Sequence, residues 1–263
     1  MADFETLQLE SDRGCTTVWL NRPDRHNAFH EGVIADLTRC FERLSTDPAV
    51  RMIVLAGRGR SFCAGADLEW MQRQASAHYD TNIADARRLA IMLRTIAQTP
   101  KPILARVHGA ALGGGLGLIC VCDLAIAAPE ATFGTTEVRL GLTPSTIAPY
   151  VLNAIGERAA GRYFLTGERF DAHEALRIGL VHELVEADAL DAQLAKMLDA
   201  LRQSGPKAQA HCKELVALLR DRDPTEPLIL EQTARSIADV RSGEEAREGI
   251  AAFLAKRKPG WIG

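Results

Sequence analysis

Two short glycine-containing segments constrain the fold of this 263-residue chain more than any other feature. Residues 61–68 follow the apolar run 52–56, and residues 108–117 follow the apolar run 103–107. A helix-like stretch comes after each segment, so the pattern predicts a strand, a tight turn and then a helix. The start of a helix presents backbone N–H groups that lack an intrahelical acceptor. Two such N–H groups that face one point would bind an oxyanion.

Short β-prone runs and amphipathic helices alternate through the first two-thirds of the chain, which predicts an α/β fold. Strands are predicted at residues 7–9, 16–20, 52–56, 103–107, 124–127 and 132–133, and helices at 33–44 and 82–98. Beyond them the pattern becomes almost continuously helical, with helices at 187–203, 206–220, 226–241 and 244–256. We therefore divide the chain into a core, residues 1–196, and a C-terminal helical region, residues 197–263. The apolar faces of that region are more than a small lobe can bury alone, so it is expected to dock on the core or on another subunit.

Composition and charge exclude several classes of partner. The formal net charge is −3 and the pI is about 6.2, which gives no reason to expect nucleic acid or an anionic membrane as a partner. The most apolar window, residues 103–128, is interrupted by Arg106, His108 and Asp123, so a membrane span is not expected. Residues 1–5 are acidic and lack the pattern of a secretion signal, which predicts a cytoplasmic protein. The six cysteines lack zinc-site spacing, so we expect reduced thiols and no metal site.

A series of short motifs extends almost from one end of the chain to the other. They occupy residues 20–23 with 27–28, 62–68, 100–102, 109–115, 122–127, 133–134, 137, 141–142, 165–167 and 175–181. In this order they resemble the motifs of the enoyl-CoA hydratase/isomerase, or crotonase, superfamily. The resemblance implies a crotonase-like spiral of ββα repeats followed by a C-terminal helical trimerisation region. It also implies a homotrimer or a dimer of trimers.

The resemblance implies a site for an acyl-CoA thioester. The backbone N–H groups of Ala66 and Gly114 would bind the thioester carbonyl oxygen, and Glu137 would be the catalytic carboxylate. The chemistry fits small residues at the two donor positions, because the substrate must approach each amide closely while an enolate-like anion forms. No metal or separate cofactor is implied, since coenzyme A is part of the substrate. The residues assigned to substrate and coenzyme A binding are Arg25, Ala64, Ala66, Asp67, Leu68, Gly114 and Lys256, of which Arg25 and Lys256 would meet the phosphates.

The chain departs from the usual hydratase pattern at one position. Hydratases of this superfamily usually carry a glutamate three residues after the oxyanion glycine, and this chain has Gly117 there. Only the later glutamate, Glu137, is retained. One glutamate can serve if it takes a proton from water and returns it to the α-carbon, provided that polar groups hold the water. Thr143, Ser145 and Tyr150 follow closely enough in sequence to be candidates for that task.

The segments around Gly117 and Glu137 favour one subfamily of the superfamily. Residues 113–118, 137–144, 147–151, 154–158 and 162–166 resemble bacterial methylglutaconyl-CoA hydratases of leucine breakdown and the related hydratases of acyclic terpene degradation. The substrates of these enzymes bear a second carboxylate. We expect that carboxylate to help position the water in place of the missing glutamate, held by Arg73, Arg87 or Arg88. The predicted activity is therefore hydration of 3-methylglutaconyl-CoA or a related branched glutaconyl-CoA.

Two other functions remain open from the sequence. A Δ3-Δ2-enoyl-CoA isomerase moves one proton between two carbons, so a single glutamate also fits that reaction. A non-catalytic acyl-CoA-binding homologue would keep the fold without the chemistry, although the retained Glu137 argues against it. The motifs of serine hydrolases, P-loop proteins and dinucleotide-binding proteins are absent.

Overall fold

The computed structural model describes residues 4–262. Residues 1–3, which carry part of the N-terminal segment considered above for a secretion signal, lie outside the described residues. The chain divides into two compact units, of which the first comprises Met1–Thr99 and Ile103–Ala195, and the second Pro100–Pro102 and Lys196–Gly263. Within residues 4–262, no helix is both long and apolar enough to cross a membrane.

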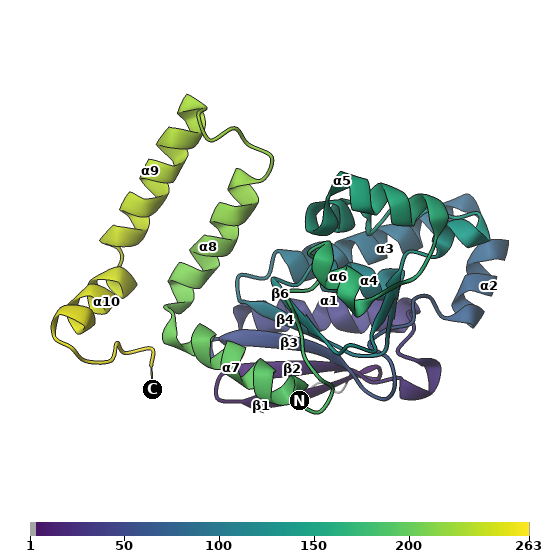
Figure 1. The fold of residues 1–263 in the computed structure, drawn as a ribbon, viewed down its shortest axis with the longest axis horizontal. Helices are drawn as coiled ribbons and strands as arrows, with labels where there is room; N and C mark the ends of the chain where they lie inside the picture. The colour runs from purple at the N-terminus through teal and green to yellow at the C-terminus, as the bar shows by residue number, and fades with distance from the viewer. Residues whose placement is uncertain (1–3, 263) are drawn as a thin grey trace. The chain divides into compact units, whose positions relative to one another are not determined.

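The first unit is built on a six-stranded sheet with the strand order β1-β2-β3-β4-β6-β9 (Figure 1). β1 pairs with β2 in the antiparallel direction, and all other neighbours in this sheet are parallel. A second sheet of three short strands has the order β5-β7-β8. The strands are β1 (Leu7–Asp12), β2 (Cys15–Leu20), β3 (Met52–Gly57), β4 (Ile103–Val107), β5 (Ala110–Leu112), β6 (Leu124–Ala127), β7 (Thr132–Gly134), β8 (Phe170–Asp171) and β9 (Glu183–Leu184).

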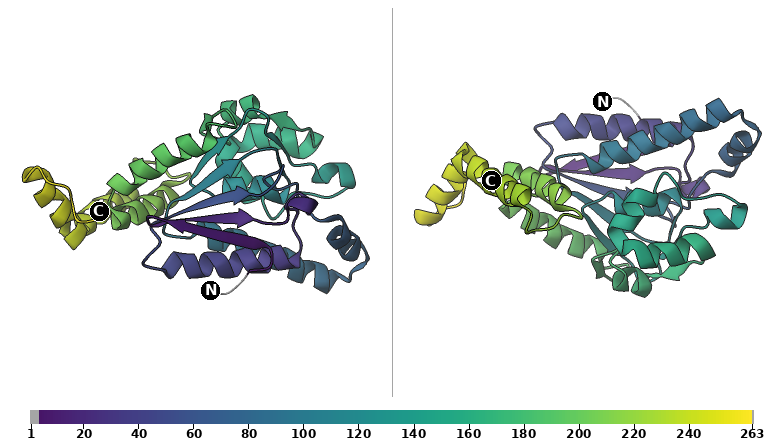
Figure 2. Two further views of the ribbon diagram at one scale, coloured as in Figure 1. Left: turned by 90° about the horizontal axis from the view of Figure 1, so that it is seen from below. Right: turned by 90° about the horizontal axis from the view of Figure 1, so that it is seen from above.

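Helices of the first unit follow the strands in the alternation that the sequence predicts. α1 and α3 run side by side along one face of the large sheet (Figure 2). The helices are α1 (Glu31–Thr46), α2 (Leu68–Ser76), α3 (Tyr79–Ala97), α4 (Gly114–Cys120), α5 (Ala148–Thr166), α6 (Ala172–Arg177) and α7 (Leu190–Gln203), with 3-10 turns η1 (Pro23–Arg25) and η2 (Glu137–Leu140). α7 begins in the first unit and continues into the second.

The second unit is helical. After the end of α7 it contains α8 (Pro206–Leu219), α9 (Pro227–Ser242) and α10 (Glu244–Leu254). A proline occupies the first helical position of both α8 and α9, where its missing N–H costs no intrahelical hydrogen bond. Large apolar side chains of this unit are exposed, namely Val216, Leu228, Leu230, Ile237, Ile250, Phe253 and Leu254. This unit therefore leaves apolar surface uncovered within one chain.

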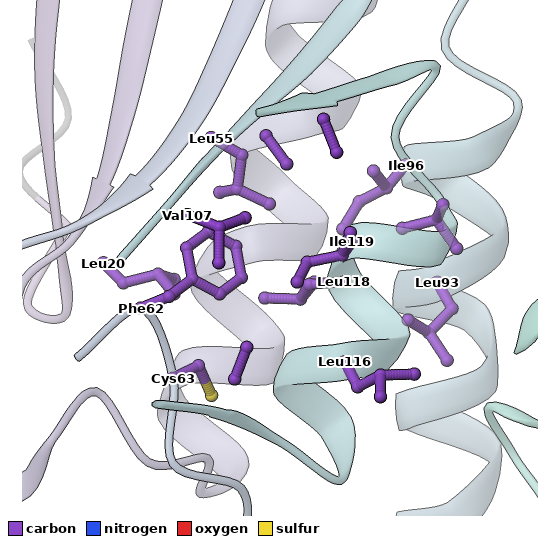
Figure 3. Close-up of a cluster of buried hydrophobic side chains, with 14 of the residues drawn as sticks. Leu20, Leu55, Phe62, Cys63, Leu93, Ile96, Val107, Leu116, Leu118 and Ile119 are labelled. Atoms are coloured by element: carbon purple, nitrogen blue, oxygen red, sulfur yellow. The ribbon is translucent and has the colours of Figure 1, made fainter. Parts of the chain in front are cut away.

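The core of the first unit lies between the large sheet and the helices. Leu20, Leu55 and Val107 project from β2, β3 and β4 and meet side chains of α3 and α4 (Figure 3). α4 contributes Leu116, Leu118 and Ile119, all fully or almost fully buried. α4 is only seven residues long, so the burial of its apolar side chains holds it in place.

Candidate active site

Three loops leave the large sheet at the carboxyl ends of neighbouring strands. β2, β3 and β4 are parallel neighbours, so the carboxyl ends of these strands lie together. The segments that follow them, residues 21–30, 58–67 and 108–114, therefore start side by side. In open parallel sheets the carboxyl ends of the strands are where ligands bind. The two glycine-containing segments singled out in the sequence are the second and third of these loops.

Backbone hydrogen bonds hold the three loops together. The N–H of Phe62 donates to the carbonyl of His108 at 2.9 Å, and the N–H of Leu112 donates to the carbonyl of Cys63 at 3.0 Å. On the other side of the middle loop, the N–H of Ala64 donates to the carbonyl of His26 at 3.0 Å. The loop that contains Ala66 is thus fixed on both sides by main-chain contacts.

Phe29 lies between the two predicted oxyanion donors. Its N–H donates to the carbonyl of Gly65 at 2.7 Å, and its carbonyl accepts the N–H of Asp67 at 2.8 Å. Because these bonds bracket Ala66, the N–H of Ala66 points away from Phe29 on the opposite side of the chain. The ring of Phe29 lies against Gly114, where an added Cβ would be 2.6 Å from Cε2. One buried residue therefore contacts both donor segments.

The amides of Ala66 and Gly114 are available to a ligand. Within residues 4–262 neither N–H donates to another atom of the chain. Gly114 is the first residue of α4, where the N–H has no intrahelical acceptor. Gly113 precedes it with φ of 50°, a conformation that favours glycine, and its own N–H donates to the carbonyl of Gly134 at 2.9 Å. The turn thus presents the amide of residue 114 from two successive residues that have no side chains of their own.

Glu137 lies next to this turn. It is the first residue of η2, and its Oε1 atom is 3.0 Å from the position that a Cβ on Gly113 would take. Its Oε2 atom is buried and has no hydrogen-bond partner within the described residues. Burial raises the pKa of the Glu137 carboxyl above its usual value. A carboxylate with a raised pKa, next to the turn that presents the amide of Gly114, can accept and return a proton near an oxyanion.

The residues predicted to hold water have different surroundings. The hydroxyls of Thr143 and Ser145 are exposed and form a hydrogen bond with each other at 2.6 Å. Tyr150 lies in the first turn of α5, and burial raises the pKa of its hydroxyl. Thr135 was not singled out in the sequence, yet its hydroxyl, two residues before Glu137, is buried and has no hydrogen-bond partner among residues 4–262.

Gly117 has no room for a side chain. A Cβ at this position would be 2.4 Å from Cγ2 of Ile147 and 3.0 Å from its Cβ. Ile147 is almost fully buried just before α5. The volume that a side chain at residue 117 would need is therefore filled by an apolar group from another element. The sequence alone shows the glycine but not its occupant.

A network around Arg22 and Asn27 supports the loop of Ala66. Asn27 is buried with φ of 56°, and its side-chain amide donates to the carbonyls of Arg58 and Ser61 at 2.9 and 2.8 Å. The guanidinium of Arg22 donates to the carbonyl of residue 28 at 2.6 Å and to Oδ2 of Asp67 at 2.9 Å. The motif at residues 20–28 was visible in the sequence, but its supporting role becomes clear only from these contacts.

The predicted coenzyme A residues occupy two units. Asp67 caps α2 by accepting the N–H of Glu69 at 3.0 Å, and the guanidinium of Arg25 bonds Glu69 at 3.1 Å on the surface. Leu68 is 77% exposed, whereas Ala64 is half-buried. Lys256 belongs to the second unit, where it is exposed just after α10.

Two of the three arginines considered for the second carboxylate already have acidic partners. Arg73 donates to both carboxylate oxygens of Glu31 at 2.9 Å. Arg88 bonds Asp85 one turn before it on α3. Arg87 is exposed and forms no ion pair within the part of the chain that the structure describes. No cluster of three or more potential metal ligands occurs among residues 4–262.

Comparison with known proteins decides the family. The family model described as enoyl-CoA hydratase/isomerase matches residues 10–263. The chain belongs to the enoyl-CoA hydratase/isomerase family. This confirms the resemblance seen in the sequence, the α/β crotonase fold and the class of enzyme, a hydro-lyase that acts on acyl-CoA.

Individual members of the enoyl-CoA hydratase/isomerase family resemble the chain over nearly its full length. The structure of an enoyl-CoA hydratase from Shewanella pealeana is 41% identical, covers 98% of this chain and 96% of its own, and has a TM-score of 0.95. The structure of Pseudomonas aeruginosa AtuE is 40% identical, covers 98% and 100%, and has a TM-score of 0.93. An (E)-benzylidenesuccinyl-CoA hydratase from Thauera aromatica is 32% identical over 262 residues, which are 98% of this chain and 99% of that protein.

Proposed function

We propose that this enzyme adds water across the α,β double bond of a branched glutaconyl thioester, with 3-methylglutaconyl-CoA as the substrate. The proposal rests on the position of the Glu137 carboxyl group. This group lies against Gly113, the residue before Gly114, and in the described part of the chain its Oε2 atom is buried without a hydrogen-bond partner. A water molecule bonded to that oxygen would be close to a thioester whose carbonyl oxygen accepts from Ala66 and Gly114.

One glutamate suffices for the proton transfers of hydration. Glu137 takes a proton from water while the water oxygen forms a bond to the β-carbon. The electron pair of the double bond moves toward the thioester, whose oxygen becomes an enolate oxygen held by the amides of Ala66 and Gly114. The protonated Glu137 then returns the proton to the α-carbon, which restores the carbonyl and the carboxylate. No group other than water is consumed.

A second carboxylate on the substrate agrees with the filled position at residue 117. Ile147 leaves no space there for a second protein carboxylate, so another polar group must orient the water. The benzylidenesuccinyl group named for the Thauera aromatica relative also carries a free carboxylate besides its thioester. Among the three arginines, Arg87 supports this role best because it forms no ion pair in the described residues. It shares a face of α3 with Arg94, seven residues later, which interacts with Tyr150 at the start of α5.

The test is an assay with three thioesters. Crotonyl-CoA, 3-methylglutaconyl-CoA and a 3-enoyl-CoA are each incubated with the enzyme and with Glu137→Gln. Hydration removes the absorbance of the conjugated thioester, whereas isomerisation creates it. We expect the highest kcat/KM for 3-methylglutaconyl-CoA, and loss of turnover by about 1000-fold in Glu137→Gln with thioester binding retained. Faster conversion of the 3-enoyl thioester would instead identify an isomerase, and binding without turnover a non-catalytic homologue.

The placement of the substrate carboxylate has its own test. Arg87→Gln should reduce the preference for 3-methylglutaconyl-CoA over crotonyl-CoA, whereas Arg88→Gln, whose guanidinium is bonded to Asp85, should leave it unchanged. An unchanged preference in Arg73→Gln, Arg87→Gln and Arg88→Gln would refute the placement.

We further propose that the helical region assembles the enzyme into a homotrimer or a dimer of trimers in the cytoplasm. The support is the row of exposed apolar side chains in the second unit, which includes Phe253 at 83% exposure. Analytical ultracentrifugation should show three or six chains per particle, and Phe253→Ser should shift the distribution toward monomer. A wild-type monomer at micromolar concentration would refute the assembly.

A further inference from the structure

Ile147 occupies a defined place beside the catalytic carboxylate. The N–H of Gly117 donates to the carbonyl of Gly113, the N-cap of α4, at 3.1 Å, so the two glycines are four residues apart, about 6 Å along the helix axis. The carboxyl group of Glu137 lies against Gly113, and the side chain of Ile147 lies against Gly117. The carboxyl group and the isoleucine therefore contact consecutive turns of one short helix.

The contact with Ile147 lies on the side of α4 that faces the start of α5, and Ile147 itself belongs to the buried core. Ile119, two residues after Gly117, lies on the opposite face of α4, among the core side chains (Figure 3). Ile147 approaches the other face from the loop between η2 and α5 and is only 2% exposed. Its contact with Gly117 is made by Cγ2 and Cβ, which are atoms close to the backbone and cannot swing aside.

We propose that Ile147 selects the acyl group by forming a stiff apolar wall beside Glu137, so that only a small apolar substituent fits next to it on the β-carbon. The inference rests on the proposed function, because it takes Glu137 to act at that carbon. In a 3-methylglutaconyl group the β-carbon bears a methyl and a carboxymethyl group. The methyl group faces Ile147, and the charged group is directed away from it, since burying a carboxylate against this wall without a partner is unfavourable.

The test compares two thioesters that differ by one methylene. The ratio of kcat/KM for 3-methylglutaconyl-CoA to that for 3-ethylglutaconyl-CoA is measured in the wild type, Ile147→Val, Ile147→Ala and a control, Val151→Ala. Val151 is equally buried one turn further along α5. We expect the wild type to favour the methyl compound, and Ile147→Ala to shift the ratio by about tenfold toward the ethyl compound. Ile147→Val, which removes one methyl group and keeps the branched shape, should shift it in the same direction by a smaller factor.

Binding of the saturated thioesters separates this inference from the proposed function. The dissociation constants of 3-methylglutaryl-CoA and 3-ethylglutaryl-CoA, which cannot be hydrated, should show the same change of preference in the Ile147 variants. If the wild type hydrates neither unsaturated thioester, the proposed function fails while the binding ratio still tests Ile147. Ratios in both Ile147 variants within about twofold of the Val151→Ala ratio would overturn the inference.

Discussion

The aromatic ring of Phe29 lies so close to the backbone of Gly114 that a Cβ at residue 114 would be 2.6 Å from it. The main chain of Phe29 also bonds Gly65 and Asp67, on either side of Ala66. The spacing of the two proposed oxyanion donors thus depends on one buried residue. A displacement of the Phe29 ring would be transmitted to both donors.

The first prediction concerns this contact. Gly114→Ala should lower kcat by about 100-fold, because the methyl group must displace either the ring of Phe29 or the amide that we propose binds the enolate oxygen. The control is Gly161→Ala in α5, where a Cβ would meet no atom within 4 Å and kcat should not change. Steady-state kinetics on the preferred thioester checks both variants. Wild-type kcat in Gly114→Ala would contradict the proposed oxyanion site.

The pH dependence of the reaction should reflect the burial of Glu137. Burial raises the pKa of this carboxyl above the usual 4.5, and the ionised form is required to take a proton from water. The rate should therefore fall on acidification, with a midpoint of kcat/KM above pH 4.5. A pH–rate profile between pH 4 and 9 measures the midpoint. An acid limb at or below pH 4.5, or its persistence in the residual activity of Glu137→Gln, would contradict this assignment.

The ion pair of Arg22 and Asp67 should contribute to stability. Its side chains are 20% and 8% exposed, so Asp67→Asn should lower the free energy of unfolding at pH 7 by about 3 kcal/mol. Glu69→Gln is the control, because its pair with Arg25 is exposed and is expected to contribute below about 1 kcal/mol. An equal decrease in the free energy of unfolding in the two variants would show that the buried pair stabilises the fold no more than the exposed pair.

Acidification should remove the contribution of the Asp67 carboxylate to the free energy of unfolding. Burial raises the pKa of Asp67, but hydrogen bonds from Arg22 and from the backbone of α2 outweigh this and leave the pKa below its usual 3.8. The carboxylate therefore stabilises the fold above pH 3.8, and the contribution is lost as the pH falls through the lower folded-state pKa. Urea unfolding between pH 2.5 and 7 should show the wild type approaching Asp67→Asn at the acid end.

Gly117 and Ile147 should be coupled in stability. Gly117→Ala should cost about 1–3 kcal/mol, because the added methyl overlaps atoms of Ile147. The cost should be smaller when the same change is made in an Ile147→Ala background, where the space is open. Chemical denaturation of the two single variants and the double variant measures this coupling. Strictly additive effects would show that the two side chains do not compete for one volume.

Arg25 and Lys256 should affect KM only for substrates that carry the phosphates of coenzyme A. Arg25→Ala and Lys256→Ala should each raise KM for an acyl-CoA about tenfold, the equivalent of about 1.4 kcal/mol from a charge-assisted hydrogen bond. KM for the same acyl group on N-acetylcysteamine, which has no phosphates, should not change. Arg235→Ala serves as the control because this exposed side chain of α9 bonds Glu231. Equal KM changes for both thioesters would refute phosphate binding.

Local sequence patterns determined the alternation of strands and helices and the family. The apolar runs at 103–107 and 124–127 became β4 and β6 at those residues, because burial on both faces leaves a plain apolar signature. Where the signal was weaker the extent differed: the strand predicted at 7–9 extends over Leu7–Asp12. The helix predicted after residues 108–117 begins already at Gly114, inside that segment, and the three-residue strand β5 is too short to show a periodicity.

The sequence identified Ala66, Gly114 and Glu137 as the candidates for catalysis through its resemblance to the crotonase superfamily, whose motifs are local features. Only the tertiary structure decided how they are held. Phe29, Asn27 and Ile147 act on the site through contacts between segments distant in the chain, and no local pattern records which atoms fill a given volume. In the sequence, Gly117 shows only that the usual glutamate is missing. In the structure, Ile147 fills the volume that a side chain at residue 117 would need, because protein interiors are closely packed.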